Sequence, residues 1–132
     1  MRLLLDVNVV LDLVLARHPW AGEAARLLTL LERGEHEGYV AGHTVTTVHY
    51  LVTRAHDRRT AAVAVADLLD ITRVAPVGGN ELRRALLLDL PDFEDAVQAA
   101  CALAVDADAI VSRDPAGFKG VSLPVLPAGA AL

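Results

Sequence analysis

The sequence has very little cysteine and no long hydrophobic run. Cys101 is the only cysteine, so no intrachain disulfide can form, which fits a reducing cytoplasm. No apolar run reaches the roughly 18 residues that a membrane-spanning helix needs. Asp6 and Asp12 interrupt the apolar start of the chain, which argues against a signal peptide. We therefore expect a cytoplasmic protein without a membrane segment.

Positive charge is also scarce. The 12 Lys and Arg residues stand against 17 Asp and Glu residues, which gives a formal net charge of −5. A simple electrostatic nucleic-acid binder is normally basic, so this class is disfavoured. A nucleic-acid enzyme whose acids hold divalent cations is still compatible with this balance, because the bound metals then carry the largest local positive charge.

The chain does have enough apolar sequence for a core. With 132 residues, 54% of them hydrophobic, it is long enough to fold as one domain (1–132) without disulfides or a structural metal. Strands are predicted at residues 2–6, 39–41, 71–74, 109–112 and 123–126, the last at a sheet edge because it carries Pro. Helices are predicted at 9–14, 20–33, 44–56, 61–69, 79–88 and 91–105, with Thr44 and Thr60 as N-caps. This alternation indicates an α/β fold, a parallel sheet with helices on both faces.

Acidic residues stand at the expected ends of two strands. Asp6 closes the first strand, and Asp114 follows the fourth directly. An ionised carboxylate beside buried aliphatic residues must be hydrogen-bonded, paired or metal-bound, and open α/β sheets bind ligands just beyond the carboxyl ends of their strands. Asp92 and Asp95 lie three residues apart at the start of the sixth helix, so they share a face. If the first and fourth strands are neighbours, these acids converge at one sheet edge.

Clustered carboxylates of this kind suit Mg²⁺ or Mn²⁺. A bound ion would lower the pKa of its water, orient a phosphodiester and stabilise transition-state charge. Without a cation the carboxylates repel one another, so at least one pKa should rise. Local alternatives stay open: Asp92 and Asp95 also fit an N-cap and an acid of a first helical turn, and Asp114 also fits a turn. Asp12 and Glu94 are expected to be solvated or paired.

Three segments resemble the PIN domain family, in particular the VapC-like toxin ribonucleases of bacterial toxin–antitoxin pairs. They are Leu5-Asp6-Val7-Asn8-Val9-Val10-Leu11-Asp12, Asp92-Phe93-Glu94-Asp95-Ala96-Val97-Gln98 and Ala109-Ile110-Val111-Ser112-Arg113-Asp114. The resemblance covers nearly the whole chain in order and spacing. It implies a three-layer fold with a central parallel sheet of four to five strands, and an acidic Mg²⁺ or Mn²⁺ site that cleaves RNA. It also implies a small antitoxin partner and homodimerisation.

The resemblance also assigns roles by position. It implies that Asp6, Asp95 and Asp114 are the metal-binding acids and that Asp92 is an additional acid near the metal. Asn8 matches the polar residue that supports the first Asp. We expect Thr44 to have a supporting role as well.

One segment departs from the family. Many PIN nucleases carry a Glu on the helix after the second strand, but residues 44–51 contain no acid. His49 stands about where this Glu would be, and a neutral His suits Mg²⁺ poorly. We therefore expect His49 to pack or to make an indirect contact rather than to bind the metal.

Other polar residues are weaker candidates for a functional role. Arg113 has the best case for a phosphate contact, because it adjoins the last predicted acid. His36 and His43 fit neither metal-ligand spacing nor a catalytic triad, and both are expected at the surface or in loops. Ser112 has no evident His base, which disfavours a hydrolase triad. Trp20 is expected to pack between the first two helices.

The sequence thus predicts a metal-dependent endoribonuclease, the toxin of a type II toxin–antitoxin pair. Two alternatives stay open. A PIN-like binding module without useful catalysis, acting through a protein or RNA partner, would explain the missing helix acid. A phosphatase of the haloacid dehalogenase type also begins with a strand-end Asp, but it expects a second Asp where Asn8 stands. The apolar helices around 27–31 and 86–88 are candidate interfaces, although an ordinary core explains most of these positions.

Overall fold

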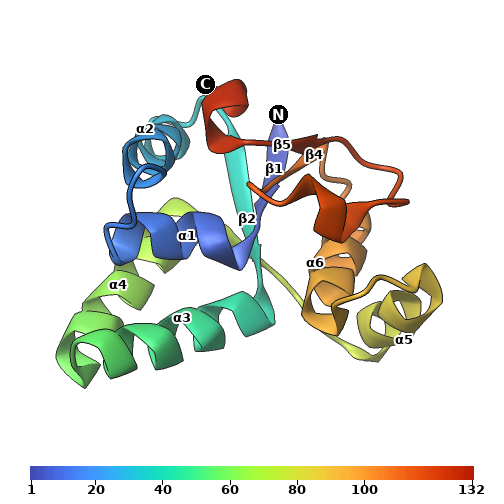
Figure 1. Ribbon diagram of the computed structural model, residues 1–132, viewed down its shortest axis with the longest axis horizontal. Coiled ribbons are helices and arrows are strands. Elements are labelled where there is room, and N and C mark those ends of the chain that lie inside the picture. The colour runs from blue at the N-terminus through green and yellow to red at the C-terminus, as the bar shows by residue number, and fades with distance from the viewer.

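The computed structural model describes residues 1–132 and contains one five-stranded sheet and six α-helices (Figure 1). The strands are β1 (Arg2–Leu5), β2 (Glu37–Ala41), β3 (Arg73–Ala75), β4 (Ala109–Val111) and β5 (Val125–Leu126). The helices are α1 (Val7–Val14), α2 (Ala21–Glu32), α3 (Gly42–Ala55), α4 (Arg58–Ile71), α5 (Gly79–Leu88) and α6 (Phe93–Ala104). Two short 3₁₀ helices, η1 (Pro115–Phe118) and η2 (Ala128–Ala131), flank β5. None of the helices has the length and apolar character needed to cross a membrane.

The sheet is parallel throughout, in the order β3-β2-β1-β4-β5. β1 lies at its centre, and Leu3, Leu4 and Leu5 are all fully buried. A continuous apolar run is typical of a parallel strand that is covered on both faces. β5 begins just after Pro124 and is shorter than the predicted strand 123–126, but it lies at the edge of the sheet as predicted.

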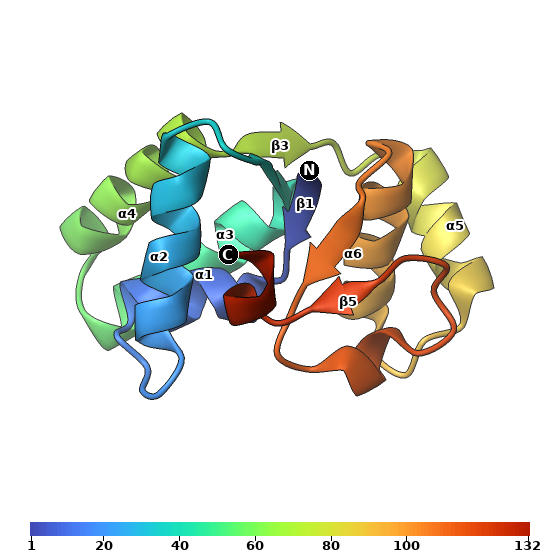
Figure 2. The same cartoon turned by 90° about the horizontal axis from the view of Figure 1, so that it is seen from above.

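Helices cover the two faces unequally. Helices α1 to α4 lie on one side of the sheet, and α5 and α6 lie on the other (Figure 2). Because successive side chains of a strand point to opposite faces, Leu3 and Leu5 join the core under the first set, whereas Leu4 and Ile110 join the core under α6. The result is the three-layer α/β architecture predicted from the alternating pattern.

The order of the strands reverses at β1. The chain runs from β1 to β2 on one side, and it later returns to β4 on the other side. In open α/β sheets, ligands bind outside the carboxyl ends of the strands at such a switch point. Asp6 directly follows β1, and its N–H donates to the carbonyl of Val111 at the end of β4, at 2.9 Å. Residues 6 and 112–114 therefore share the carboxyl edge of the sheet.

Local predictions were wrong at the ends of α3 and α4. The β-branched run 71–74 was expected to form a strand, but α4 continues to Ile71 and β3 begins at Arg73. The N–H and hydroxyl of Thr72 both donate to the Leu68 carbonyl, so this residue bonds back to the helix. Asp57, not Thr60, caps α4, because its carboxylate accepts the N–H of Thr60 at 2.7 Å.

Thr44 does not cap α3. The helix begins two residues earlier, at Gly42, with Ala41 in the N-cap position. Thr44 is fully buried within the first turn, where its hydroxyl points toward α6 instead of closing its own helix. It therefore lies at the sheet edge where the acids were expected to meet.

Candidate active site

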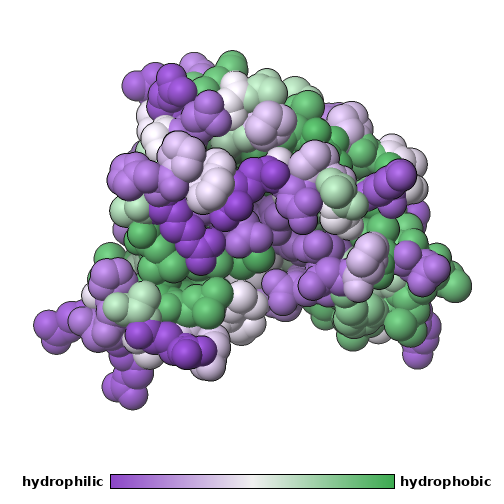
Figure 3. All heavy atoms as spheres, in the orientation of Figure 1, coloured by the Kyte–Doolittle hydropathy of each residue, from purple (hydrophilic) through white to green (hydrophobic).

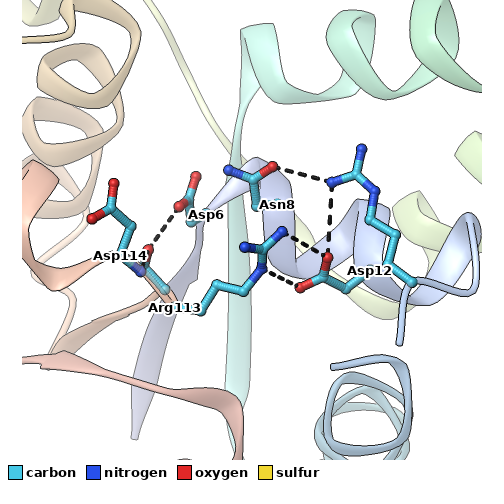
Figure 4. Close-up of polar contacts among 7 residues, drawn as sticks. Asp6, Asn8, Asp12, Arg113 and Asp114 are labelled. Atoms are coloured by element: carbon cyan, nitrogen blue, oxygen red, sulfur yellow. Dashed lines mark hydrogen bonds and ion pairs between the residues drawn. The ribbon is translucent and has the colours of Figure 1, made fainter. Parts of the chain in front are cut away.

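Asp6 is a buried carboxylate whose protein partners are uncharged. Only 2% of the residue is exposed. Its Oδ1 accepts a hydrogen bond from Gln98 Nε2 at 3.0 Å, and its Oδ2 accepts one from Ser112 Oγ at 2.8 Å. Both donors are neutral, and no Lys, Arg or His side chain pairs with Asp6. Asp6 thus lies at the sheet edge without a cationic partner (Figure 4).

Gln98 connects Asp6 to Asp95. It is fully buried on α6, and its Nε2 also donates to Asp95 Oδ1 at 3.3 Å. Its Oε1 accepts from the N–H of Val7 at 3.0 Å and from Thr44 Oγ1 at 3.5 Å. The Val7 N–H can only donate, so it fixes which end of the amide faces the acids. Gln98 therefore sets the spacing between the two carboxylates, and Thr44 supports it.

Asp95 is the acid most affected by its neighbours. It lies half-buried in the first turn of α6, where Asp92 caps the helix by accepting the Asp95 N–H at 3.0 Å. Burial, followed by repulsion from the Asp6 carboxylate and then from Asp92 and Asp114, raises the pKa of Asp95 to about 7. The predicted cap is confirmed, and the predicted repulsion among these acids is present.

Asp114 is the third acid at this edge of the sheet, beside Asp6 and Asp95. Ser112 Oγ accepts the Asp114 N–H at 3.0 Å while it donates to Asp6, so one hydroxyl connects these two acids. A Cβ added to Gly117 would lie 2.9 Å from Asp95 Oδ2 and 3.1 Å from Asp114 Oδ2. Both carboxylate oxygens thus face the same small space, and the absence of a side chain at Gly117 keeps this space open.

The donor set fits a hard divalent cation, although the set is incomplete. All its members are carboxylate oxygens, which Mg²⁺ and Mn²⁺ prefer, and burial together with repulsion from the neighbouring carboxylates raises the pKa of Asp95. In the present arrangement, however, no three His, Cys, Asp or Glu side chains are placed to hold one ion. Mg²⁺ is often held by only one or two carboxylates and several waters, so two converging acids suffice for such a site. His49 is half-buried on α3, and its ring makes no hydrogen bond to the acids.

Two predicted neighbours of the acids bond elsewhere. Asn8 makes no hydrogen bond to Asp6, and its Oδ1 instead accepts from Arg17 at 3.3 Å. Arg113 pairs with Asp12, with Nε 2.9 Å from Oδ2 and Nη2 3.3 Å from Oδ1. Asp12 is therefore paired, one of the two states predicted for it. The supporting role predicted for Asn8 stays a prediction, and the structure offers Gln98 and Ser112 as the residues that hold Asp6.

His43 was expected at the surface or in a loop, and this was wrong. It lies in the first turn of α3, and both of its ring nitrogens are buried without a hydrogen-bond partner. Burial lowers the pKa of His43, and the nearby Glu94 only partly opposes this effect. The ring is therefore neutral at ordinary pH.

Gln98, Ser112 and Gly117 were not predicted as site residues. Signals for the first two were present: Gln98 lies three residues after Asp95 on the same face of α6, and Ser112 directly follows β4. Ser112 was considered only as a nucleophile, whereas both residues donate hydrogen bonds to Asp6. Nothing in the local sequence marks Gly117, whose importance depends on how η1 folds over the acids.

The family model for the PIN domain matches residues 2–116, so the chain belongs to the PIN domain family. This assignment leaves no support for the phosphatase alternative. No curated protein matches the sequence.

Solved structures with the same fold include VapC toxins. VapBC2 from Rickettsia felis, bound to a DNA fragment from its promoter, superposes with a TM-score of 0.75 and 15% identity over 96% of this chain and 98% of that chain. Mycobacterium tuberculosis VapC20, described as a Sarcin-Ricin loop cleaving toxin, superposes with a TM-score of 0.73 and 20% identity over 92% of this chain and 95% of that chain. FitAcB from Neisseria gonorrhoeae superposes with a TM-score of 0.72 and 18% identity over 96% of this chain and 97% of that chain. The α/β PIN-like fold predicted from the sequence is confirmed.

Proposed function

We propose that this PIN-domain protein is a metal-dependent endoribonuclease and the toxin of a type II toxin–antitoxin pair. One observation carries the proposal. Asp6 is buried with neutral donors only, beside Asp95, whose pKa is raised to about 7. Carboxylates that lie close together without a cationic partner repel one another, and a bound divalent cation would relieve this repulsion. The similarity in fold to VapC20, a Sarcin-Ricin loop cleaving toxin, supports RNA as the substrate class.

The residues divide into those that would hold the cation and those that position them. Asp6, Asp95 and Asp114 would hold Mg²⁺ or Mn²⁺. When bound, the ion supplies positive charge that orients a phosphodiester and activates water. Gln98 and Ser112 hold the Asp6 carboxylate in place at the sheet edge through hydrogen bonds to its two oxygens.

Asp92 acts on Asp95 through the backbone. By accepting the Asp95 N–H, it fixes the start of α6 and hence the direction of the Asp95 side chain. Thr44 acts at greater distance, through Gln98. Outer contacts of this kind typically change metal affinity or activity by about 10–100-fold.

The test is RNA cleavage by the Asp6→Asn variant. Asn keeps the size of the side chain but removes its charge, so Mn²⁺-dependent cleavage should fall below detection. Asp70→Asn, at an exposed position of α4, is the matched control and should cleave like the wild type. Full activity of Asp6→Asn would defeat the assignment.

A surface for the antitoxin lies away from the acids. Helices α1, α2 and α4 enclose a groove of about 600 Å³, lined mainly by apolar residues that include Val10, Leu13, Leu28, Val63 and Leu68. Figure 3 shows hydrophobic surface on the side where α1 and α4 lie, whereas hydrophilic residues gather over the centre of this face. The chain itself has a net charge of −5, so promoter binding of the VapBC2 kind would need a basic partner. An apolar segment of that partner would fill the groove.

This partner proposal is tested with the product of the adjacent gene. Val63 is 57% exposed, so Val63→Glu should leave the fold intact but place a charge in the groove. Co-purification of the two proteins should be lost with Val63→Glu and kept with Val74→Glu, a control at another exposed valine, on β3. Equal binding by both variants would remove the groove from the proposal.

The binding-module alternative still has a specific observation behind it. Helix α3 offers no acid to the site, and as arranged the site lacks a third convergent ligand. A protein that cleaves no RNA with Mg²⁺ or Mn²⁺, yet binds its partner tightly, would favour this alternative. The cytoplasmic location, inferred from the lone Cys101, stays a prediction.

Homodimerisation also stays a prediction, and of the two candidate interfaces only one is exposed. Leu27, Leu28 and Leu31 of α2 are buried in the core, whereas Leu86 and Leu87 of α5 are 69% and 85% exposed. A second copy of the chain would cover these two leucines. Sedimentation of a Leu87→Arg variant checks this, because a dimer built on α5 should dissociate.

A further inference from the structure

A second polar group lies beside the acids and is built around Asp12. This residue is 2% exposed on the inner side of α1. Arg113 contacts both of its oxygens in a two-pronged pair, at 2.9 and 3.3 Å. The Arg113 guanidinium also stacks over the ring of Trp20, with its Cζ 3.8 Å from the ring centroid. The pair and the stack together fix the plane of the guanidinium.

Arg17 brings a second cation to the same carboxylate. Its Nη1 lies 3.8 Å from Asp12 Oδ1 and donates to Asn8 Oδ1 at 3.3 Å. Two guanidinium groups thus share one carboxylate and one neutral amide, so the group carries a surplus of positive charge. Glu23 lines the small cavity beside Arg113 but forms no ion pair with either arginine.

Both arginines keep unused donors at the surface. Their side chains are about one third exposed, at 33% for Arg17 and 32% for Arg113. A guanidinium has five N–H donors, and Nη1 of Arg113 makes no hydrogen bond within the protein. A structural ion pair needs one arginine, whereas this group has two, each with donors left for an anion.

The two arginines lie beside the acids, where the phosphates of a bound RNA strand would need a cationic partner. Figure 4 shows Asp114 and Asp6 on one side and Asp12 on the other, with Asn8 and the side chain of Arg113 between them. Arg113 directly precedes Asp114, and Asn8 lies two residues after Asp6. The acids repel the phosphates of an RNA strand, so a strand that lies across them needs cations nearby, and phosphate contacts generally fix the register of a nucleic acid.

We propose that Arg17 and Arg113, held in place by Asp12, form a phosphate-binding subsite for the RNA strand beside the acidic pocket. The two arginines contact a phosphate next to the one that is cleaved. Asp12 is a positioning residue, which acts through Arg113 and touches no substrate. This inference rests on the proposed function for its substrate, but RNA binding at the subsite needs neither a metal nor cleavage.

The test is the binding of a short, fluorescein-labelled single-stranded RNA in EDTA, measured by anisotropy at several salt concentrations. Arg17→Gln and Arg113→Gln should each weaken binding about five- to tenfold and reduce the salt slope by about 1. Arg33→Gln, which removes an exposed arginine at the far end of α2, is the matched control and should stay within about twofold of the wild type. The emission of Trp20, the only tryptophan, should change on RNA addition in the control but not in Arg113→Gln.

The Asp12→Asn variant shows whether Asp12 acts by holding the two arginines in place or only through its own negative charge. Removing a negative charge would strengthen RNA binding if only net charge mattered, whereas the loss of the fixed arginines weakens it. We expect weaker binding at temperatures where melting curves show the variant folded. Tighter binding by Asp12→Asn, equal losses in Arg17→Gln and Arg33→Gln, or no RNA binding by the wild type at low salt would each overturn the subsite.

Failure of the subsite and failure of the nuclease proposal look different. If the wild type binds RNA through Arg17 and Arg113 in EDTA but never cleaves it with Mn²⁺, the subsite stands and the nuclease proposal fails. If the wild type cleaves RNA while the arginine variants bind and cleave like Arg33→Gln, the nuclease proposal stands and the subsite fails.

Discussion

Asp6 and Asp12 are six residues apart, and both are 2% exposed, but their surroundings differ in one respect. Asp6 receives hydrogen bonds from a neutral amide and a neutral hydroxyl. Asp12 receives two guanidinium groups. Burial alone therefore does not identify a functional acid, since a buried charge can be stabilised by either kind of partner. The charge of the partner decides whether the acid can still attract a cation.

The largest expected effect is on stability, and it should separate the two acids. Asp12→Asn leaves two guanidiniums without their carboxylate and should cost about 2 kcal/mol, less than for a fully buried pair because the arginines are partly exposed. Asp6→Asn relieves repulsion among the acids and should cost nothing or stabilise the fold. Urea denaturation in EDTA measures both. Equal losses would show that partner charge does not distinguish the two sites.

The next effect concerns Gln98, which holds Asp6 and Asp95 at a fixed spacing. Gln98→Leu keeps a similar volume but removes both donors and leaves the Val7 N–H unpaired. We expect Mn²⁺ affinity to fall by about 10–100-fold, as is usual when residues that orient metal ligands are replaced. Calorimetric titration measures it, with Gln98→Glu as a second variant that restores acceptors but adds charge. Unchanged affinity in Gln98→Leu would remove this residue from the site.

A smaller effect is expected at Gly117. An Ala methyl group would approach the facing oxygens of Asp95 and Asp114 to about 3 Å, closer than such atoms pack. The carboxylates can move aside, so Gly117→Ala should fold normally but bind Mn²⁺ about tenfold more weakly. Gly120→Ala, where a Cβ meets no atom within 4 Å but φ is +94°, should instead lower the melting temperature and leave binding unchanged. If Gly117→Ala instead leaves Mn²⁺ binding unchanged and Gly120→Ala weakens it, the cation does not bind in the space beside Gly117.

The last expected effect is a change of stability with pH. The pKa of Asp95 is raised from 3.8 to about 7, so the folded state binds this proton more tightly than the unfolded state. The associated stability is fully present below about pH 4 and is lost as the pH rises through 7. Melting temperature in EDTA should fall over this range, and less so for Asp95→Asn. Added Mn²⁺ should stabilise the wild type more at pH 8 than at pH 5, and an equal gain at both would contradict the account.

The sequence predicted the layers and the acids for a simple reason. Alternation of apolar strands and amphipathic helices determines a parallel sheet, and such a sheet brings the ends of β1 and β4 together, with Asp6 and Asp114 after them. It did not predict Gln98 and Ser112 as partners of Asp6, because hydrogen bonds between elements depend on how α6 sits against the sheet. The third strand begins at Arg73, two residues later than predicted, because the N–H and the hydroxyl of Thr72 both bond back to the helix.

The same limit applies to the arginines. From the sequence, Arg113 was a candidate for phosphate contact because of its neighbour, and nothing suggested that Arg17 would join it across Asp12. Residues 12, 17 and 113 come from α1, the loop after it and the segment that follows β4, and only the folded chain brings them together.

The most direct test of the central claim is calorimetric titration of the metal-free protein with Mn²⁺, comparing the wild type with Asp6→Asn, Asp95→Asn and the control Asp70→Asn. We expect the wild type and Asp70→Asn to bind the ion alike and both site variants to lose binding. Binding of equal strength in all four proteins, or in none, would contradict a cation site made from Asp6, Asp95 and Asp114.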